Sequence, residues 1–260
     1  MNNPRKYGIA PYKIAVLHGG PGAPGEVAPV AREISTICGT LEPIQTSDNI
    51  DGLIQELHTI FNNHAEFPIT LVGHSWGAWL SFMYAARFSS EVKKLILISS
   101  PPFETKYVHM IMETWISRLE KRDMLRLVEL ENALNDPERK DKNETLAKYR
   151  DVIHKTDSFD PLPLPDDLLE YSYEIFQRLS EEGNVLRRNG ELLGMAKQIQ
   201  CPVVAIHGDY DPHPAEGVES PLSKYISDFR FILLKDCGHD PWLERGVKDG
   251  FFEILKEELK

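Results

Sequence analysis

The stretch Ile69-Thr70-Leu71-Val72-Gly73-His74-Ser75-Trp76-Gly77 decides the fold of this chain. It starts as an apolar run typical of a buried strand, passes through the pattern GxSxG, and continues into the apolar-rich segment 78–88, which predicts a helix. A serine on a strained turn between strand and helix needs flanking glycines, because a Cβ there would obstruct the neighbouring backbone. This context favours a nucleophile at Ser75 over an ordinary glycine-rich turn.

Similar apolar runs lie on both sides of this stretch, at residues 14–17, 95–98, 202–206 and 229–234. Continuous apolar runs of this length indicate strands that are covered on both faces, as in a parallel sheet packed between helices. Segment 50–61 carries apolar residues at helical spacing between two of the expected strands. The alternation predicts an α/β fold with a mostly parallel central sheet and helices on both faces.

The middle of the chain has a different pattern, with many Glu, Lys, Arg and Leu residues at helical spacing and no clear strand. We therefore predict a core of residues 1–101 and 200–260 and an inserted helical cap, or lid, of residues 102–199. Within the cap, the proline-rich segment 160–166 predicts an extended connection rather than a ligand for a polyproline-binding partner. A weaker strand is expected at residues 40–46, and the last helix from about residue 243 to the end.

Composition limits the classes of function. The chain has 260 residues, a length that fits one large domain, and its formal net charge of −11 argues against binding to nucleic acid. No apolar run approaches the roughly 18 residues that span a bilayer, so no membrane partner is expected. Residues 1–7 lack the apolar stretch of a secretory signal, which predicts a cytoplasmic location. The widely spaced Cys38, Cys201 and Cys237 suit reduced, packed thiols better than disulfides or a zinc site.

A serine hydroxyl is a weak nucleophile at neutral pH and needs a general base, which a carboxylate in turn orients. In α/β folds with GxSxG these groups follow in the order Ser, acid, His. Asp209 and Asp211 come directly after one expected strand, and His239 follows the next. Because functional groups gather at the carboxyl ends of parallel strands, we expect His239 to be the base and one of the two aspartates to be the acid.

Three other histidines lie near these motifs. His213 is too close to the aspartates in sequence to bridge easily to Ser75, and His74 and His207 are expected to be hydrogen-bonded packing residues. No HExxH or comparable spacing of metal ligands is present, so no metal site is predicted.

The chemistry also needs backbone N–H groups that stabilise the developing oxyanion, each contributing roughly 3–4 kcal/mol to lowering the barrier. One donor is expected to be the amide of Trp76, and the other should come from the turn His18-Gly19-Gly20-Pro21-Gly22 after the first long strand. This turn lacks the Lys-Ser/Thr ending of a P-loop and the spacing of GxGxxG, which argues against phosphate binding.

Four motifs taken together, HGGPG at 18–22, GHSWG at 73–77, GDYDP at 208–212 and CGHDPW at 237–242, resemble the proline iminopeptidase branch of the α/β-hydrolase superfamily. The resemblance covers the sheet residues at both ends of the chain. It implies that Asp211 rather than Asp209 is the catalytic acid and that Gly20 is the second oxyanion donor. It also implies an α/β-hydrolase fold that works without a cofactor.

The chain departs from this family in two places. The family has an antiparallel pair of strands before the HGGPG strand, whereas only about a dozen residues precede residue 14 here, which predicts a sheet without that edge hairpin. The family also binds a free amino terminus with acidic lid residues, for which no motif is found here. The candidates in this lid are Glu170, Glu174, Glu181 and Glu182, although such carboxylates more often form a solvated helix face.

Three classes of function follow from these residues. The first is an aminopeptidase that removes an N-terminal residue, often proline, and the second is an esterase or other acyl hydrolase that acts on small molecules. The third is a binding scaffold without catalysis, which the intact set of Ser75, Asp211 and His239 argues against. We expect a small-molecule or short-peptide substrate, and the sequence predicts neither its identity nor the oligomeric state.

Overall fold

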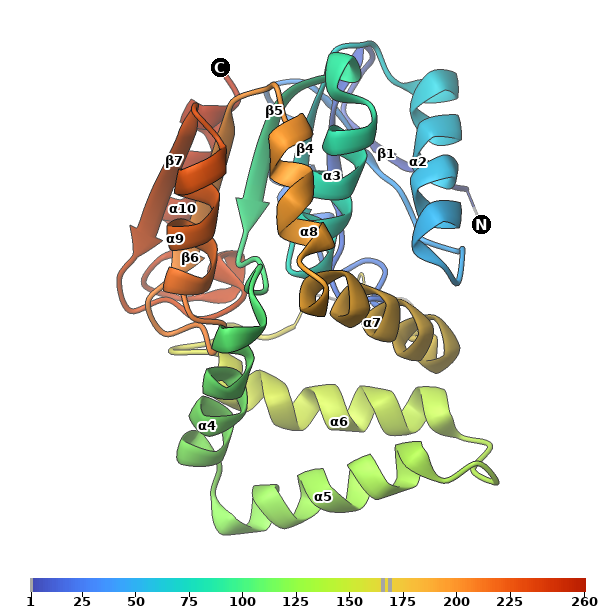
Figure 1. The fold of residues 1–260 in the computed structure, drawn as a ribbon, viewed down its shortest axis with the longest axis vertical. Coiled ribbons are helices and arrows are strands. Elements are labelled where there is room, and N and C mark those ends of the chain that lie inside the picture. The colour runs from blue at the N-terminus through green and yellow to red at the C-terminus, as the bar shows by residue number, and fades with distance from the viewer. Residues whose placement is uncertain (1, 165–166, 168–169) are drawn as a thin grey trace.

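A seven-stranded sheet forms the centre of the computed structural model, which describes residues 2–164, 167 and 170–260 (Figure 1). The strands are β1 (Arg5–Tyr7), β2 (Tyr12–Leu17), β3 (Gly39–Glu42), β4 (Ile69–His74), β5 (Val92–Ile98), β6 (Val203–Gly208) and β7 (Phe229–Leu234). Their order across the sheet is β1-β3-β2-β4-β5-β6-β7, with β1 antiparallel to β3 and every other pair parallel. The carboxyl ends of β2 to β7 therefore lie at one edge of the sheet, as predicted for a mostly parallel α/β fold.

Helices cover both faces of the sheet. Those of the core are α1 (Ala28–Ile34), α2 (Ile50–His64), α3 (Trp76–Arg87), α8 (Glu191–Gly194), α9 (Glu216–Tyr225) and α10 (Lys248–Glu258). Side chains of α1 and α10 pack on one face, and those of α2, α3, α8 and α9 pack on the other. Single-turn 3₁₀ helices occupy Ser89–Glu91, Thr105–Tyr107, Met195–Gln198 and Pro241–Leu243.

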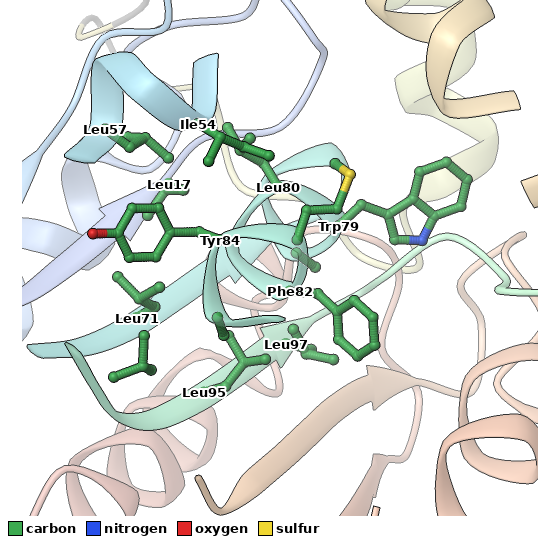
Figure 2. Close-up of a cluster of buried hydrophobic side chains, with 14 of the residues drawn as sticks. Leu17, Ile54, Leu57, Leu71, Trp79, Leu80, Phe82, Tyr84, Leu95 and Leu97 are labelled. Carbon is green, nitrogen blue, oxygen red and sulfur yellow. The ribbon is translucent and has the colours of Figure 1, made fainter. Parts of the chain in front are cut away.

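The two faces are built from alternate residues of the same strands. On β4, Leu71 belongs to the cluster under α2 and α3, and Val72 belongs to the cluster under α1 and α10. Figure 2 shows the first cluster, in which strand leucines meet the helix side chains of Trp79 and Tyr84. Because both faces are covered, the central strands are apolar throughout, and this made them readable in the sequence.

Four further helices lie beyond the carboxyl edge of the sheet (Figure 1). They are α4 (Val108–Arg118), α5 (Lys121–Asn135), α6 (Lys142–Asp157) and α7 (Tyr173–Arg188). Leu127 and Leu130 of α5 pack with Val152 and Ile153 of α6 in a small apolar cluster of their own. The α7 helix lies between this pair and the core, close to α3.

The boundary of the cap at residue 199 stays a prediction, since residues just before it pack on the core. Leu192 of α8 and Ala196 belong to the cluster around α3. The predicted extended segment 160–166 makes a β-bridge from Pro161 to Glu244, and its residues 165–166 lie outside the described part of the chain.

The edges differ from expectation in detail. One three-residue strand, β1, precedes β2 in the described chain and pairs with β3, so the edge holds a single added strand rather than a hairpin. The strand expected at residues 40–46 ends at Glu42, and the last helix starts at Lys248, because Pro241 begins a separate 3₁₀ turn. None of the described helices is both long and apolar enough to cross a membrane.

Candidate active site

Ser75 lies on the turn between β4 and α3 with φ 52° and ψ −121°, a conformation that residues with a side chain rarely adopt. A Cβ on Gly73 would come within 2.2 Å of the Gly77 carbonyl oxygen, and a Cβ on Gly77 within 2.3 Å of the Leu17 carbonyl oxygen. Both positions therefore require glycine. The strained turn predicted from GxSxG is present, and it raises Ser75 at the carboxyl edge of the sheet.

His239 and Asp211 meet at the same edge, each on a loop that follows a strand. His239 Nδ1 donates to Asp211 Oδ2 at 2.8 Å. Asp209, the alternative acid, instead accepts from the backbone N–H of Cys237 at 3.3 Å and so holds the two loops together. The structure thus joins the predicted base to Asp211 and not to Asp209.

The electrostatics of this pair follow from burial and from mutual attraction. Burial alone would raise the pKa of Asp211, but the neighbouring imidazoles, His239 foremost, hold it well below its ordinary value. Burial would lower the pKa of His239, and the Asp211 carboxylate outweighs that effect, so the pKa of His239 is raised. The arrangement favours an ionised carboxylate beside a strongly basic ring.

Ser75, His239 and Gly20 line one cavity of about 230 Å³. Among the described residues, the Ser75 hydroxyl has no hydrogen-bond partner, and no acceptor meets the backbone N–H of Gly20 or Trp76. Trp76 is the first residue of α3, where the N–H groups are unused by the helix. The predicted oxyanion donors are therefore both available at this edge.

Comparisons with known proteins agree with this geometry. The family model described as alpha/beta hydrolase fold matches residues 52–245, which is most of the chain. The chain belongs to the α/β-hydrolase fold family. The proline iminopeptidase of Saccharolobus solfataricus is 23% identical in a match that covers 94% of this chain and 83% of that protein.

Solved structures show the same fold. The crystal structure of VinJ superposes with a TM-score of 0.71 at 18% identity, covering 98% of this chain and 93% of that one. The proline iminopeptidase of Mycobacterium smegmatis gives a TM-score of 0.66 at 16% identity, again covering 98% and 93%. At these identities the likeness to the solved structures shows the fold and does not identify a substrate.

His213 makes a contact that the sequence-based prediction did not consider. His213 contacts the predicted acid, because its backbone N–H and its Nδ1 both donate to Asp211 Oδ1 at 2.9 Å. Its ring stacks on His239 with centroids 4.7 Å apart. The prediction considered only whether His213 reaches Ser75. The prediction overlooked the sequence Asp-Pro-His, in which a histidine two residues after an aspartate can fold back so that its ring contacts the carboxylate.

A second buried network supports the turn after β2. Glu26 Oε1 accepts from the Gly19 N–H and contacts His74 Nδ1 at 2.9 Å, while Glu26 Oε2 contacts Arg150 of α6 at 3.2 Å. His74 also contacts the His239 carbonyl oxygen through Nε2 at 3.1 Å. His74 is thus the hydrogen-bonded packing residue that was expected, and it links the loops that carry Gly20 and His239.

His207, the other expected packing residue, is buried on β6. Its Nε2 contacts the carbonyl oxygen of His213 at 2.7 Å. Burial lowers the pKa of His207, which favours the neutral ring beneath the acid loop.

Aromatic rings and carboxylates line the rest of the cavity. The rings come mainly from the cap and are Trp115, Tyr149, Tyr171 and Phe176, and the carboxylates are Glu26, Asp151, Asp157 and Asp240. Two of these carboxylates are paired with cations, Glu26 with Arg150 and Asp240 with His154. Asp151 and Asp157 face the cavity without a cationic partner among the described residues.

The four lid carboxylates named as candidates for binding an amine lie outside this cavity. Glu174 pairs with Arg178, and Glu181 pairs with Arg188. Glu182 accepts from the Ile50 N–H at the start of α2, and Glu170 contacts Asn143. Helical spacing placed these residues on α7 or next to it but did not reveal which face of α7 meets the site.

Asp211, His213 and His239 have potential metal-ligating atoms within 4.8 Å of one another. A cation there would displace the Nδ1 protons that both rings already share with the carboxylate. The cluster is therefore better suited to its hydrogen bonds than to a metal.

Proposed function

We propose that this α/β hydrolase cleaves an ester or amide bond through a covalent acyl-enzyme formed on Ser75. The observation that supports this most directly is the 2.8 Å contact between His239 and Asp211 on the cavity that Ser75 also lines. The left-handed turn at Ser75 adds to it, because strain of this kind persists where it serves a site.

In the mechanism, His239 Nε2 accepts the hydroxyl proton of Ser75 as its Oγ attacks the acyl carbon. The amides of Gly20 and Trp76 hold the tetrahedral oxyanion, and Asp211 stabilises the imidazolium. The bond to the leaving group then breaks as His239 protonates it. Water, deprotonated by His239, attacks the acyl-enzyme, and the proton returns to Ser75 as the acid is released.

A Ser75→Ala variant should lower kcat by on the order of 10⁶, because the three residues act as a unit. Ser223→Ala is the matched control, since this exposed hydroxyl bonds only to the Ser220 carbonyl oxygen. Turnover and labelling by an organophosphonate would be measured on both. Unchanged turnover in Ser75→Ala would overturn the proposal, and failure of the native protein to label would revive the scaffold without catalysis.

We further propose that the substrate carries a free amino group next to the reacting acyl group, as in an N-terminal aminopeptidase. The supporting residue is Asp157 at the end of α6, which lines the cavity and whose backbone oxygen accepts from the His239 N–H at 2.8 Å. Asp157 Oδ1 accepts from Trp115 Nε1 at 2.7 Å, and Oδ2 has no donor among the described residues.

The charge of Asp157 favours a cationic ligand. The residue is 8% exposed, and burial raises the pKa of its carboxyl because the charged form lacks solvation. A substrate ammonium would supply that missing stabilisation, as an ion pair shielded from water. The distant proline iminopeptidase relatives are consistent with such a substrate.

The alternative is a small ester without an amino group, which the aromatic lining of the cavity favours. Native enzyme would be compared on prolyl and other aminoacyl arylamides and on p-nitrophenyl esters of the same acyl size. With an aminopeptidase, Asp157→Asn should raise KM for the amine-bearing substrates about 10–100-fold, the loss of one charge-assisted pair. Glu174→Gln, on the exposed side of α7, should change nothing.

If the rate of ester hydrolysis depends neither on the amino group of the substrate nor on the Asp157→Asn substitution, the result would support the esterase instead.

A further inference from the structure

The Asp211 carboxylate serves two imidazoles, whereas the proposed mechanism uses one. Oδ2 accepts from His239, and Oδ1 accepts two hydrogen bonds from His213, one from the backbone and one from Nδ1. Since an ionised carboxylate only accepts, both Nδ1 atoms carry protons. In the neutral state, each ring therefore has its unprotonated nitrogen at Nε2.

Both Nε2 atoms are open to the cavity. His213 and His239 line it together with Ser75, and neither Nε2 has a hydrogen-bond partner among the described residues. Both atoms keep some contact with solvent, so neither is buried without a partner. The rings are stacked with an interplanar angle of 29° and centroids 4.7 Å apart. His213 thus lies on the cavity beside the proposed base.

Titratable groups from several elements surround His213. Asp211 faces it from its own loop and His239 from the loop after β7. The His207 ring of β6 contacts its carbonyl oxygen, and Asp157 of α6 is near enough for its carboxyl pKa to be lowered by the charge of His213. Two carboxylates and two imidazoles therefore surround the ring of His213.

We propose that His213 is a positioning residue for the proposed hydrolytic reaction, which holds Asp211 Oδ1 so that Oδ2 faces His239. This inference rests on the proposed function. The two hydrogen bonds from His213 fix one carboxylate oxygen, and the other oxygen is thereby aligned with Nδ1 of His239. A carboxylate held in this way keeps the His239 ring in the orientation that proton transfer from Ser75 requires.

The expected signature is a loss of kcat, with little change in KM, when the side-chain donor to Asp211 is removed. His213→Asn retains a side-chain N–H near the position of Nδ1, so kcat should stay within about tenfold of the native value.

His213→Phe retains a ring to stack on His239 but has no donor for Asp211. We expect kcat to fall about 10–100-fold with little change in KM, because Asp211 loses one of the hydrogen bonds that fix it. Rescue by Asn but not by Phe separates positioning from packing. His109→Asn, at an exposed position on α4, is the control and should behave as native.

Melting temperatures would be measured for every variant, so that a variant that fails to fold is recognised. A native-like kcat in a folded His213→Phe would overturn the role of His213. If His213→Phe does not fold, a His213→Asn kcat more than tenfold below the native value would overturn it. If Ser75→Ala were fully active, the proposed function would fail instead, and the two failures are therefore distinguishable.

Discussion

At the scale of single residues, the chemistry depends on how three loops place charge around His239. Asp211 contacts the ring directly, Asp240 is its neighbour in sequence, and Asp157 accepts from its backbone. All three carboxylates raise the pKa of His239. The surrounding carboxylates thus make His239 a stronger base and change the pH range in which it can accept a proton.

Because His239 must be neutral to accept the Ser75 proton, a raised pKa moves the acid limb of the kcat/KM profile to a higher pH. We expect its midpoint above 6.5, the value for an unperturbed histidine. Asp211→Asn should move the limb back down and lower kcat by about 10⁴, since the ring loses its orienting carboxylate. Steady-state kinetics from pH 5 to 10 would show both. A native midpoint below 6.5 would contradict the expectation.

The sequence indicates some of these residues and not others for a physical reason. Ser75, Asp211 and His239 lie in short motifs at strand ends, where the parallel sheet brings distant segments together. Their catalytic roles stay predictions until activity is measured. Glu26 and Asp157 lie outside any motif, and each acts through contacts between the core and the cap that only tertiary structure creates.

At the scale of elements, the turn between β4 and α3 depends on glycines more than on any side chain. Gly77→Ala would force a Cβ against the Leu17 carbonyl oxygen, which is backbone and cannot move aside. We expect a loss of about 1–3 kcal/mol in the free energy of unfolding and a displaced Ser75 with reduced turnover. Gly250→Ala on α10, where nothing lies within 4 Å, should be neutral or stabilising.

Urea titration of both variants would measure this difference, and an equally stable, fully active Gly77→Ala would show that the turn tolerates a side chain.

The elements that were predicted well are those covered on both faces. Strands β2, β4, β5 and β6 each contain a mostly apolar run, and the sheet order brings them to its centre. The edge strand β1 has the sequence Arg-Lys-Tyr, which shows no apolar pattern. It is a strand because its backbone pairs with β3. Helical periodicity also predicted helices in the middle of the chain, but it does not encode the partner of a helix. The division into core and cap therefore stays a prediction, and Leu192 of α8 packs on the core.

At the scale of the whole molecule, the cap is attached to the core by charge as well as by apolar packing. Arg150 and His154, one turn apart on α6, contact Glu26 and Asp240 beside the site. These partly buried pairs form part of the cavity wall and link the charge of α6 to that of the core. The same charges that form the site thus couple folding to pH.

This coupling predicts a melting temperature that is highest between about pH 4 and pH 6.5. The pKa values of Glu26, Asp211 and Asp240 are depressed in the folded chain, so their stabilisation is complete above about pH 4 and is lost as the pH falls further. The pKa values of His154 and His239 are raised, so their stabilisation is complete below about pH 6.5 and is lost as the pH rises through those values.

Two buried carboxyls act in the opposite direction and reduce the size of the effect. Burial raises the pKa values of Glu42 and Asp157, so their protonation at acid pH favours the folded chain and offsets part of the loss. Each depressed carboxyl loses about 1.4 kcal/mol of stabilisation per pH unit below its unfolded pKa, so we expect the melting temperature to fall by about 5–10 °C from pH 5 to pH 2.5. His154→Gln should flatten the alkaline side and also weaken the acid side, because His154 helps to lower the pKa of Asp240. Calorimetry at constant ionic strength measures both limbs, and a melting temperature that rises steadily towards pH 10 would refute the link between these ion pairs and folding.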